Sequence, residues 1–352
     1  MIKYYTRACN FYYGHKANQL IKDNKALPLC GVKRIAFDKI QIFKRADDKV
    51  TSKLININKI KFLSSKIRKK VKKNLKKISS KRKNFLKNLN FSNPSIMGIL
   101  NLTPDSFSDG GKFHDFRKAN IHIKEMINFG AEIIDVGGES TRPGSKTIHH
   151  KKEWQRIEKV LKNFKKKHNG KILSLDTRKS EIMVKSLKYG VDIINDVSGF
   201  EHDKNSLKSL KSYNIAKVIH HMQGTPNTMQ KNPRYNNVLL DIYDFFEKKL
   251  NKIKRKNIIL DPGIGFGKNL KHNLTLISNI SLFHSLGFPI LVGTSRKRFI
   301  NQISGTYDSR DRTGGTIASV LFLLCQGVQI FRVHNVKEVK QGILVFKKIL
   351  SN

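Results

Sequence analysis

The chain has 352 residues, 39% of them hydrophobic, which supplies enough apolar material for a sizeable core and excludes global disorder. Its three cysteines, Cys9, Cys30 and Cys325, include no C-x-x-C pair, which excludes a disulfide framework and a cysteine zinc site. The first 20 residues contain no apolar signal-peptide core, and the most apolar run, 320–325, is too short to cross a bilayer. We therefore expect a cytoplasmic protein with reduced thiols and no membrane partner.

The net charge of +43 is concentrated in the first quarter of the chain. Residues 1–92 carry 26 Lys and Arg against 4 Asp and Glu, a net charge of +22, whereas the remaining 260 residues carry +21. Such a basic segment can bind nucleic acid, because Lys and Arg release counterions from phosphate backbones. Lysine is abundant along the whole chain, however, so we favour a compositional bias and expect no nucleic-acid partner.

The basic segment also shows secondary-structure patterns. The run Ile35–Phe43 is rich in β-forming residues and partly alternates, which predicts a strand. Farther on, apolar residues at spacings of four, four and three share one face of a lysine-rich helix: Ile67, Val71, Leu75 and Ile78. A basic amphipathic helix can touch membranes or nucleic acid, but we favour packing of its apolar face on a neighbouring element. We treat 1–92 as an extension of unknown role and 93–352 as the catalytic domain.

From residue 95 onward, short apolar runs alternate with helix-period segments about every 30 to 40 residues. The predicted strands are Ile96–Asn101, Glu132–Val136, Ile172–Asp176, Asp192–Asp196, Ala216–His221, Ile258–Asp261, Pro289–Gly293 and Ile330–His334. Helical patterns lie between them, for example over Glu181–Leu187, Leu239–Leu250 and Thr316–Leu324, and Asn335 resembles an N-cap for a last helix.

Strands this apolar, alternating with helices, predict a parallel sheet that is covered on both faces. Eight repeats in the 260 residues after position 92 fit an α/β fold of the (β/α)8 TIM-barrel type with a basic N-terminal extension. The competing architecture is an open doubly wound sheet. That fold usually has a glycine-rich phosphate turn after its first strand, and the segment 101–104 (NLTP) is not such a turn.

Every predicted strand ends in at least one polar side chain. These residues are Asn101, Asp135, Asp176, Asn195, Asp196, His220, His221, Asp261, Ser295, Lys297, Arg332 and His334. In a (β/α)8 barrel the carboxyl ends of the strands meet at one mouth, where the active site lies. Single polar residues could be caps or loop contacts, but a full ring of them indicates an active site.

The types of residue in this ring indicate which class of ligand the site binds. Buried carboxylates and an amide suit a flat heterocycle with paired N–H groups. Lys297, Arg332 and His334 follow the last two strands, where barrel enzymes commonly hold a phosphate. The segment Gly263–Lys268 is not a P-loop, because Asn269 stands where a Ser or Thr is required. Metal binding by His220 and His221 is disfavoured, because neighbouring strand residues point to opposite faces.

Several segments together resemble the dihydropteroate synthase family of pterin-binding TIM-barrel enzymes. They are 96–111 (IMGILNLTPDSFSDGG), 133–144 (IIDVGGESTRPG), 175–177 (LDT), 194–196 (IND), 221–224 (HMQG), 260–268 (LDPGIGFGK), 294–297 (TSRK) and 332–334 (RVH). The resemblance covers residues 95–349 and leaves out the extension, which is far longer than the short N-terminal hairpin of the family.

The resemblance implies roles for the matching positions. The pterin ring would be held by Asp176, Asn195, Asp261 and Lys297, with Met222 and Phe266 shaping the pocket. The pyrophosphate would lie at Asn101, Arg332 and His334, with Mg²⁺ bound through Asn101. The p-aminobenzoate side would include Ser295 and Arg296, together with the loop residues Phe107, Thr141 and Arg142. Catalysis would fall to Asp176, Lys297, Arg332 and His334.

The expected reaction joins a dihydropterin pyrophosphate to p-aminobenzoate in an SN1-like displacement. The aromatic amine is a weak nucleophile, so the main task is to neutralise charge that grows on the departing pyrophosphate. The alternative is a methyltransferase that uses methyltetrahydrofolate on a similar pterin-binding barrel. That enzyme would need neither the pyrophosphate group of residues nor the two long signature loops. A homodimer is compatible with the sequence.

Overall fold

The computed structural model describes residues 2–103, 112–253 and 256–351. Its larger part is a barrel of eight parallel strands: β5 (Ser95–Asn101), β6 (Ile133–Gly137), β7 (Ile172–Asp176), β8 (Ile193–Asp196), β9 (Ala216–His220), β10 (Ile258–Asp261), β11 (Leu291–Val292) and β12 (Ile330–Val333). The strands are hydrogen-bonded in the order β10-β9-β8-β7-β6-β5-β12-β11. A parallel bridge between Leu260 and Ile290 closes the circle. This confirms the predicted (β/α)8 fold.

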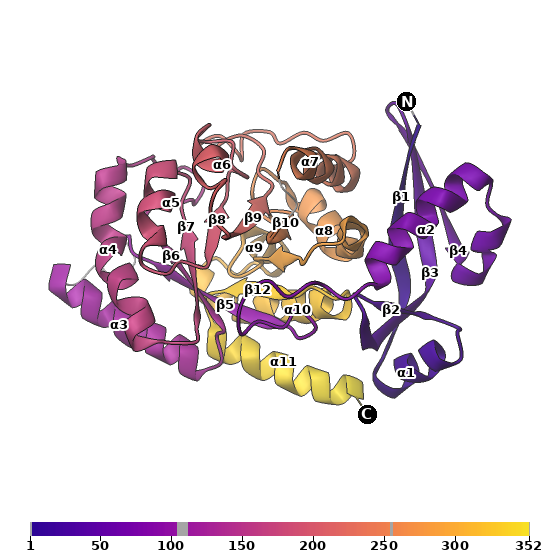
Figure 1. Ribbon diagram of the computed structural model, residues 1–352, viewed down its shortest axis with the longest axis horizontal. Coiled ribbons are helices and arrows are strands. Elements are labelled where there is room, and N and C mark those ends of the chain that lie inside the picture. The colour runs from indigo at the N-terminus through magenta and orange to yellow at the C-terminus, as the bar shows by residue number, and fades with distance from the viewer. Residues whose placement is uncertain (1, 104–111, 254–255, 352) are drawn as a thin grey trace.

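Helices cover the outside of the barrel (Figure 1). They are α3 (Lys112–Asn128), α4 (His150–Lys167), α5 (Ser180–Leu187), α6 (Ser206–Ser209), α7 (Val238–Lys252), α8 (Leu270–Ser278), α9 (Arg298–Ser304), α10 (Thr313–Cys325) and α11 (Val336–Ser351), with 3-10 turns η3 (Ile280–Leu286) and η4 (Ser309–Asp311). All eight predicted strands are present. The seventh is shorter than predicted, and Pro289 at its expected start has no N–H with which to pair.

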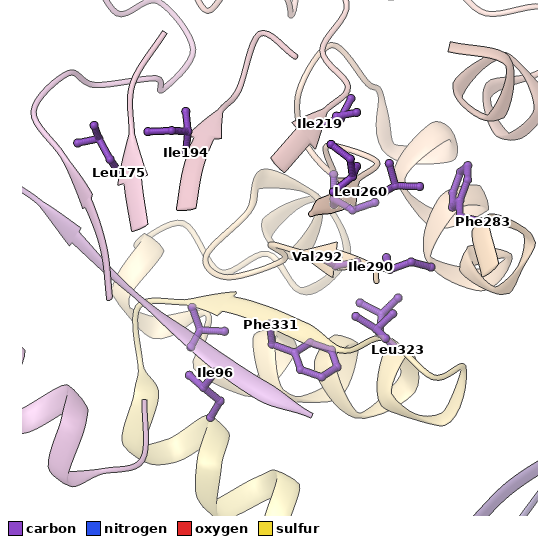
Figure 2. Close-up of a cluster of buried hydrophobic side chains, with 14 of the residues drawn as sticks. Ile96, Leu175, Ile194, Ile219, Leu260, Phe283, Ile290, Val292, Leu323 and Phe331 are labelled. Atoms are coloured by element: carbon purple, nitrogen blue, oxygen red, sulfur yellow. The ribbon is translucent and has the colours of Figure 1, made fainter. Parts of the chain in front are cut away.

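The main core lies between the strands and these helices. Figure 2 shows Leu175, Ile194, Ile219 and Leu260 on neighbouring strands, with Phe283 of η3 and Leu323 of α10 among the same cluster. Each of these side chains is buried. These side chains point outward, toward the helices. Because successive residues of a strand face opposite sides, the residues between them point into the barrel.

The end of the barrel at which the strands begin is closed by the chain segment that precedes β5. Leu86, Leu89 and Phe91 form one buried cluster with residues at the start of the strands. Those partners are Met97, Ile133, Ile172, Ile193, Ala216, Val218, Ile259, Leu291 and Ile330. These three side chains of the extension thus belong to the apolar interior of the barrel.

The rest of the extension folds as a lobe beside the barrel, at the right of Figure 1. It contains β1 (Ile2–Tyr13), α1 (Gly14–Lys22), β2 (Leu27–Leu29), β3 (Val32–Ala46), β4 (Lys49–Asn56), η1 (Ile57–Phe62) and α2 (Ser65–Ser79). The long central strand β3 pairs antiparallel with β1, β2 and β4. The predicted strand lies within β3, and the predicted amphipathic helix is α2, whose apolar face packs on this sheet.

Acidic residues of α7 hold the lobe to the barrel. The hydroxyl of Tyr5 donates to Asp244 over 2.9 Å, and Lys3 also forms an ion pair with Asp244. Arg45 donates to Asp241 over 2.6 Å. Some of the basic excess of the extension is therefore neutralised within the protein. None of the helices in the described part of the chain combines the length and apolarity needed to span a membrane.

We expect Phe91→Ala to lower the free energy of unfolding by about 3–5 kcal/mol, because it opens a cavity at the closed end of the barrel. Urea unfolding followed by the fluorescence of Trp154, the only tryptophan, measures this change. Phe62→Ala is the matched control, since that side chain is 71% exposed and its loss should change stability little. Equal stability of the two variants would show that the segment does not close the barrel.

Candidate active site

A cavity of about 600 Å³ opens at the carboxyl ends of the strands. Most of the residues assigned from the sequence line it: Asn101, Thr141, Arg142, Asn195, Asp261, Phe266, Ser295, Arg296, Lys297, Arg332 and His334. Asp176 and Met222 lie behind this lining, and Phe107 falls outside the described residues. The strand ends therefore bring together residues that are up to 233 positions apart, from Asn101 to His334.

Arg332 on β12 is the centre of the polar network below the cavity. Its Nε donates to Asp135 over 2.6 Å, and its Nη2 donates to Asp176 over 2.9 Å. Asp135 also accepts hydrogen bonds from Ser174 Oγ at 2.6 Å and from Asn195 Nδ2 at 3.0 Å. This fully buried carboxylate connects three neighbouring strands to β12.

Asp135 was recognised in the sequence as a polar strand end but was given no role at the site. Its position carries the signal that was missed: it stands opposite Ser174 in the β6–β7 register, on the face that points into the barrel. An inward carboxylate surrounded by apolar strand residues requires a partner, and an arginine on another strand could have been proposed.

The network changes the protonation of its members. Burial raises the pKa of Asp176 to about 7; the positive charge of Arg332 lowers it and the negative charge of Asp135 adds to the rise. Burial by itself lowers the pKa of Arg332, but the carboxylates of Asp135 and Asp176 outweigh this effect and raise it. Near neutral pH, Asp176 is therefore divided between its ionised and protonated forms beside a permanent cation.

A second group of residues presents hydrogen-bond acceptors to the cavity. Burial raises the pKa of Asp261 to about 6, and its Oδ1 accepts from the backbone N–H of Gly263 at 2.8 Å. Asn195 Oδ1 is buried and has no hydrogen-bond partner among the described residues. Since a buried polar atom without a partner costs free energy, this acceptor is suited to a donor on a ligand.

Lys297 and Phe266 form the wall next to these acceptors. The Nζ of Lys297 lies 4.1 Å from the centre of the Phe266 ring, within range of a cation–π interaction. Burial lowers the pKa of Lys297 to about 8, and the charge of Arg332 lowers it further. Phe266 in turn packs with Met222, Val197 and Met229 in a small apolar cluster. Met222 therefore shapes the cavity through Phe266.

The two neighbouring histidines have different environments, as strand geometry predicts. His220 lines the cavity and its Nδ1 lies 2.8 Å from the carbonyl oxygen of Val197. His221 points away and its Nδ1 lies 3.1 Å from the Nζ of Lys268. Lys268 itself donates to the carbonyl of Phe266, which fixes the glycine-rich loop 263–268.

The side of the cavity formed by β11 and β12 is strongly basic. His334 Nδ1 lies 3.0 Å from Ser295 Oγ, and burial together with Arg296, Arg332 and Lys297 lowers the pKa of His334 well below its usual value. Arg296 adopts a left-handed backbone conformation with φ of 59° and donates twice to Asn335 Oδ1, at 3.0 and 2.8 Å. A neutral imidazole among cations can donate to an anion without adding repulsion.

The loop after β6 is anchored at its base by an ion network. Glu139 is buried and accepts from Arg178 Nη2 at 2.6 Å and Lys179 Nζ at 2.9 Å. Thr141 and Arg142 follow it and line the cavity. Any closing movement of this loop is thus limited to the residues after Glu139. The sequence did not reveal that Glu139 anchors the loop.

Comparisons with known proteins agree with this geometry. The sequence profile of a family described as pterin binding enzyme matches residues 97–334. The chain is 40% identical over 268 residues to dihydropteroate synthase of Escherichia coli K12, covering 75% of this chain and 94% of that protein. It is also 40% identical over 261 residues to the Bacillus subtilis dihydropteroate synthase, covering 73% of this chain and 88% of that protein.

Solved structures give the same result. Dihydropteroate synthase of Yersinia pestis in a sulfonamide drug complex superposes with a TM-score of 0.71 at 36% identity, covering 75% of this chain and 97% of that one. The Xanthomonas albilineans enzyme with 4-aminobenzoic acid superposes with a TM-score of 0.70 at 31% identity, covering 75% and 96% of the two chains.

We expect Asp261→Asn to stabilise the fold at neutral pH. A buried carboxyl with a raised pKa favours folding while protonated, so its contribution is complete at low pH and is lost as pH rises through about 6. The asparagine stays neutral and can still accept from Gly263. Because the pKa of Asp261 in the folded protein is about two pH units above its ordinary value, we expect the substitution to raise the free energy of unfolding at neutral pH by about 3 kcal/mol.

Urea unfolding of the wild type and the variant at pH 4.5 and pH 7.5 measures this difference, which should be small at the lower pH and larger at the higher. The exposed Asp311→Asn is the control and should show no such pH dependence. A variant that is less stable than the wild type at pH 7.5 would contradict the raised pKa of Asp261.

Proposed function

Because the chain belongs to the dihydropteroate synthase family of pterin-binding enzymes, we propose that its cavity is divided among the three parts of that reaction. The enzyme is a transferase of folate biosynthesis. It condenses (7,8-dihydropterin-6-yl)methyl diphosphate with p-aminobenzoate to give 7,8-dihydropteroate and diphosphate. The assignments of individual residues follow from the family resemblance, and the chemistry and positions of the residues support them.

The pterin ring is assigned to the acceptor group. The observation that carries this assignment is the free, buried Asn195 Oδ1, which lies in the same cavity as the Asp261 carboxylate. The 2-amino and ring N–H groups of a pterin supply donors for a carboxylate and an amide oxygen. Lys297 offers a donor on the same wall, and Phe266, supported by Met222, gives the ring an apolar surface.

The diphosphate is assigned to the opposite, basic side at Asn101, Arg332 and His334. Arg332 remains paired with Asp135 and Asp176, so its charge is already partly compensated, while neutral His334 contributes an N–H donor. Among the described residues no cluster of three or more acidic, histidine or cysteine side chains could hold a metal alone. Asn101 offers one neutral oxygen that would hold a Mg²⁺ ion, and this ion would supply positive charge for the diphosphate.

The p-aminobenzoate is assigned to the outer part of the cavity. Ser295 and Arg296 lie on the β11 side, and Thr141 and Arg142 lie on the loop across from them. Arg296 and Arg142 supply charge for the carboxylate of this substrate. Phe107 keeps only the role implied by the family resemblance. In this assignment the amine faces the reacting methylene and the carboxylate faces solvent.

The proposed mechanism is an SN1-like displacement. The C–O bond breaks first, and its electron pair leaves with the diphosphate beside Arg332 and His334. A bound Mg²⁺ would supply additional positive charge for the leaving group. The methylene cation, conjugated with the electron-rich dihydropterin, is stabilised by the ionised Asp176. The amine then forms the C–N bond and releases its proton to water or diphosphate, so no strong general base is required.

We further propose that the enzyme works in the cytoplasm and forms a homodimer. All three cysteines are free thiols, which suits a reducing compartment. Exposed apolar side chains gather on the adjacent helices α10 and α11, at Phe322, Leu344 and Val345. Such a surface is typical of a contact between protein molecules.

The function is tested by following diphosphate release from (7,8-dihydropterin-6-yl)methyl diphosphate with and without p-aminobenzoate. We expect release to depend on p-aminobenzoate and to match the formation of 7,8-dihydropteroate. Removal of divalent ions with a chelator should slow it, and added Mg²⁺ should restore it. Release that is fast without p-aminobenzoate, and yields no dihydropteroate, would contradict the proposal.

The acceptor role of Asp261 is tested by measuring pterin binding to Asp261→Asn by calorimetry. The substitution replaces one acceptor oxygen with a donor, so we expect a loss of about 2–4 kcal/mol of binding free energy. Asp311→Asn is again the control and should bind pterin like the wild type. Because Asp261→Asn should fold at least as stably as the wild type, weaker binding by this variant cannot be attributed to unfolding. Wild-type affinity would refute the assignment.

A further inference from the structure

A second cavity of about 350 Å³ lies where the extension meets the opposite end of the barrel from the active site. The extension contributes Leu29, Val32 and Phe91, and the barrel contributes Leu324, Val328 and Leu344. Leu29, Phe91 and Val328 are almost completely buried, so they form a fixed apolar floor. The volume is at the lower end of the range for small-molecule sites, about 300–1,000 Å³.

Three basic side chains border this apolar space. Lys348 is exposed, and the other two are half-buried and come from opposite partners. Arg34 comes from β3 of the extension, and Lys347 comes from α11 of the barrel. Arg34 donates to Asn93 Oδ1 at 3.1 Å and to the carbonyl oxygen of Ser92, which fixes its guanidinium at the wall. Its remaining N–H groups are available to a ligand, because a guanidinium has five.

The charges of these two groups are not neutralised within the described part of the chain. Burial lowers the pKa of Arg34, and burial together with repulsion from Arg34 lowers the pKa of Lys347. No carboxylate contributes to either shift. This differs from the contact with α7, where Arg45 and Lys3 meet acidic partners. Two half-buried cations repel each other beside an apolar surface. An anion with an apolar body would neutralise their charges and also cover this surface.

We propose that this junction cavity binds a small amphiphilic carboxylate, with its apolar part on Leu29, Phe91 and Val328 and its carboxylate between Arg34 and Lys347. The ligand would bridge the extension and the barrel and so stabilise their association. This site is separate from the cavity at the other end of the barrel, and its existence does not depend on the reaction assigned there.

The position of the cavity links it to the catalytic strand β12. Gln329, which lines the cavity, is buried and accepts from the backbone N–H of Ile290 at 2.8 Å. It directly precedes β12, which carries Arg332 three residues later. Three strand residues span roughly 10 Å. Gln329 therefore connects the junction cavity to the start of a strand whose other end lines the active-site cavity.

Decanoate, used below the concentration at which it forms micelles, is the probe for this site. Calorimetric titration of the full chain should show one saturable site, and decanoate should raise the midpoint of thermal unfolding, because it binds only the folded state. Decan-1-ol has the same apolar body without the charge and should bind at least about tenfold more weakly. Decylammonium should not bind at this site, because its charge matches that of Arg34 and Lys347.

Variants locate the binding. Lys347→Gln removes no hydrogen bond that the structure describes, so it should fold normally and weaken decanoate binding about tenfold. Arg34→Gln should have a similar effect. The matched control is Lys33→Gln, which removes one charge from an exposed neighbour and should leave the affinity unchanged.

Three outcomes would overturn the proposal. The first is equal affinity of the wild type, Lys347→Gln and Arg34→Gln for decanoate. The second is equal binding of decanoate and decylammonium, which would indicate non-specific apolar association. The third is loss of decanoate binding in Arg296→Gln, which would place decanoate on the basic side of the active site.

Discussion

The guanidinium of Arg332, held between two buried carboxylates, is the interaction on which the mouth of the barrel depends. It connects β12 to β6 through Asp135 and to β7 through Asp176, and Asp135 extends the network to Asn195 on β8. Removing one member of a buried ion network leaves the others unpaired, at a cost of several kcal/mol. The same contacts orient the amide of Asn195, so that its nitrogen faces Asp135 and its oxygen is left free for a ligand. In the proposed assignment, structural support and substrate recognition thus use the same side chains.

This arrangement also explains how the site accommodates opposite charges. The carboxylates that pair with Arg332 lie deep, whereas the β11–β12 side carries Arg296 and the neutral His334. In the proposed assignment the diphosphate lies beside Arg332 and His334, and the positive charge of the methylene forms near Asp176. Because the pKa of Asp176 is about 7 and that of Lys297 about 8, modest changes in charge on the substrate alter the protonation of both.

Periodicity and the position of polar residues were sufficient to predict the barrel and the end at which its polar residues collect, whereas Thr141, Arg142, Phe266 and Arg296 were assigned from the family resemblance. The strand ends had to converge once eight parallel strands were recognised, and eleven of the assigned residues do line the cavity. The contacts that could not be predicted are those made by side chains from distant segments. Asp135 and Glu139 occur in recognisable motifs, but their arginine and lysine partners are set by packing. The sheet of the extension was also missed beyond β3, because β1 is partly buried on both faces and shows no clear alternation.

The contacts of β1 with the second half of the barrel have a consequence for how the chain acquires its structure during synthesis. The hydroxyl of Tyr5 bonds to Asp244, and the carbonyl oxygen of Ala8 accepts from Ser281 Oγ, across separations of 239 and 273 residues. Because β1 precedes α7 and η3 by more than 200 residues, it is synthesised well before these partners exist. Contacts of such high sequence separation form late and slow folding. During that interval the high positive charge of residues 1–92 favours solubility, because like charges repel other copies of the lobe.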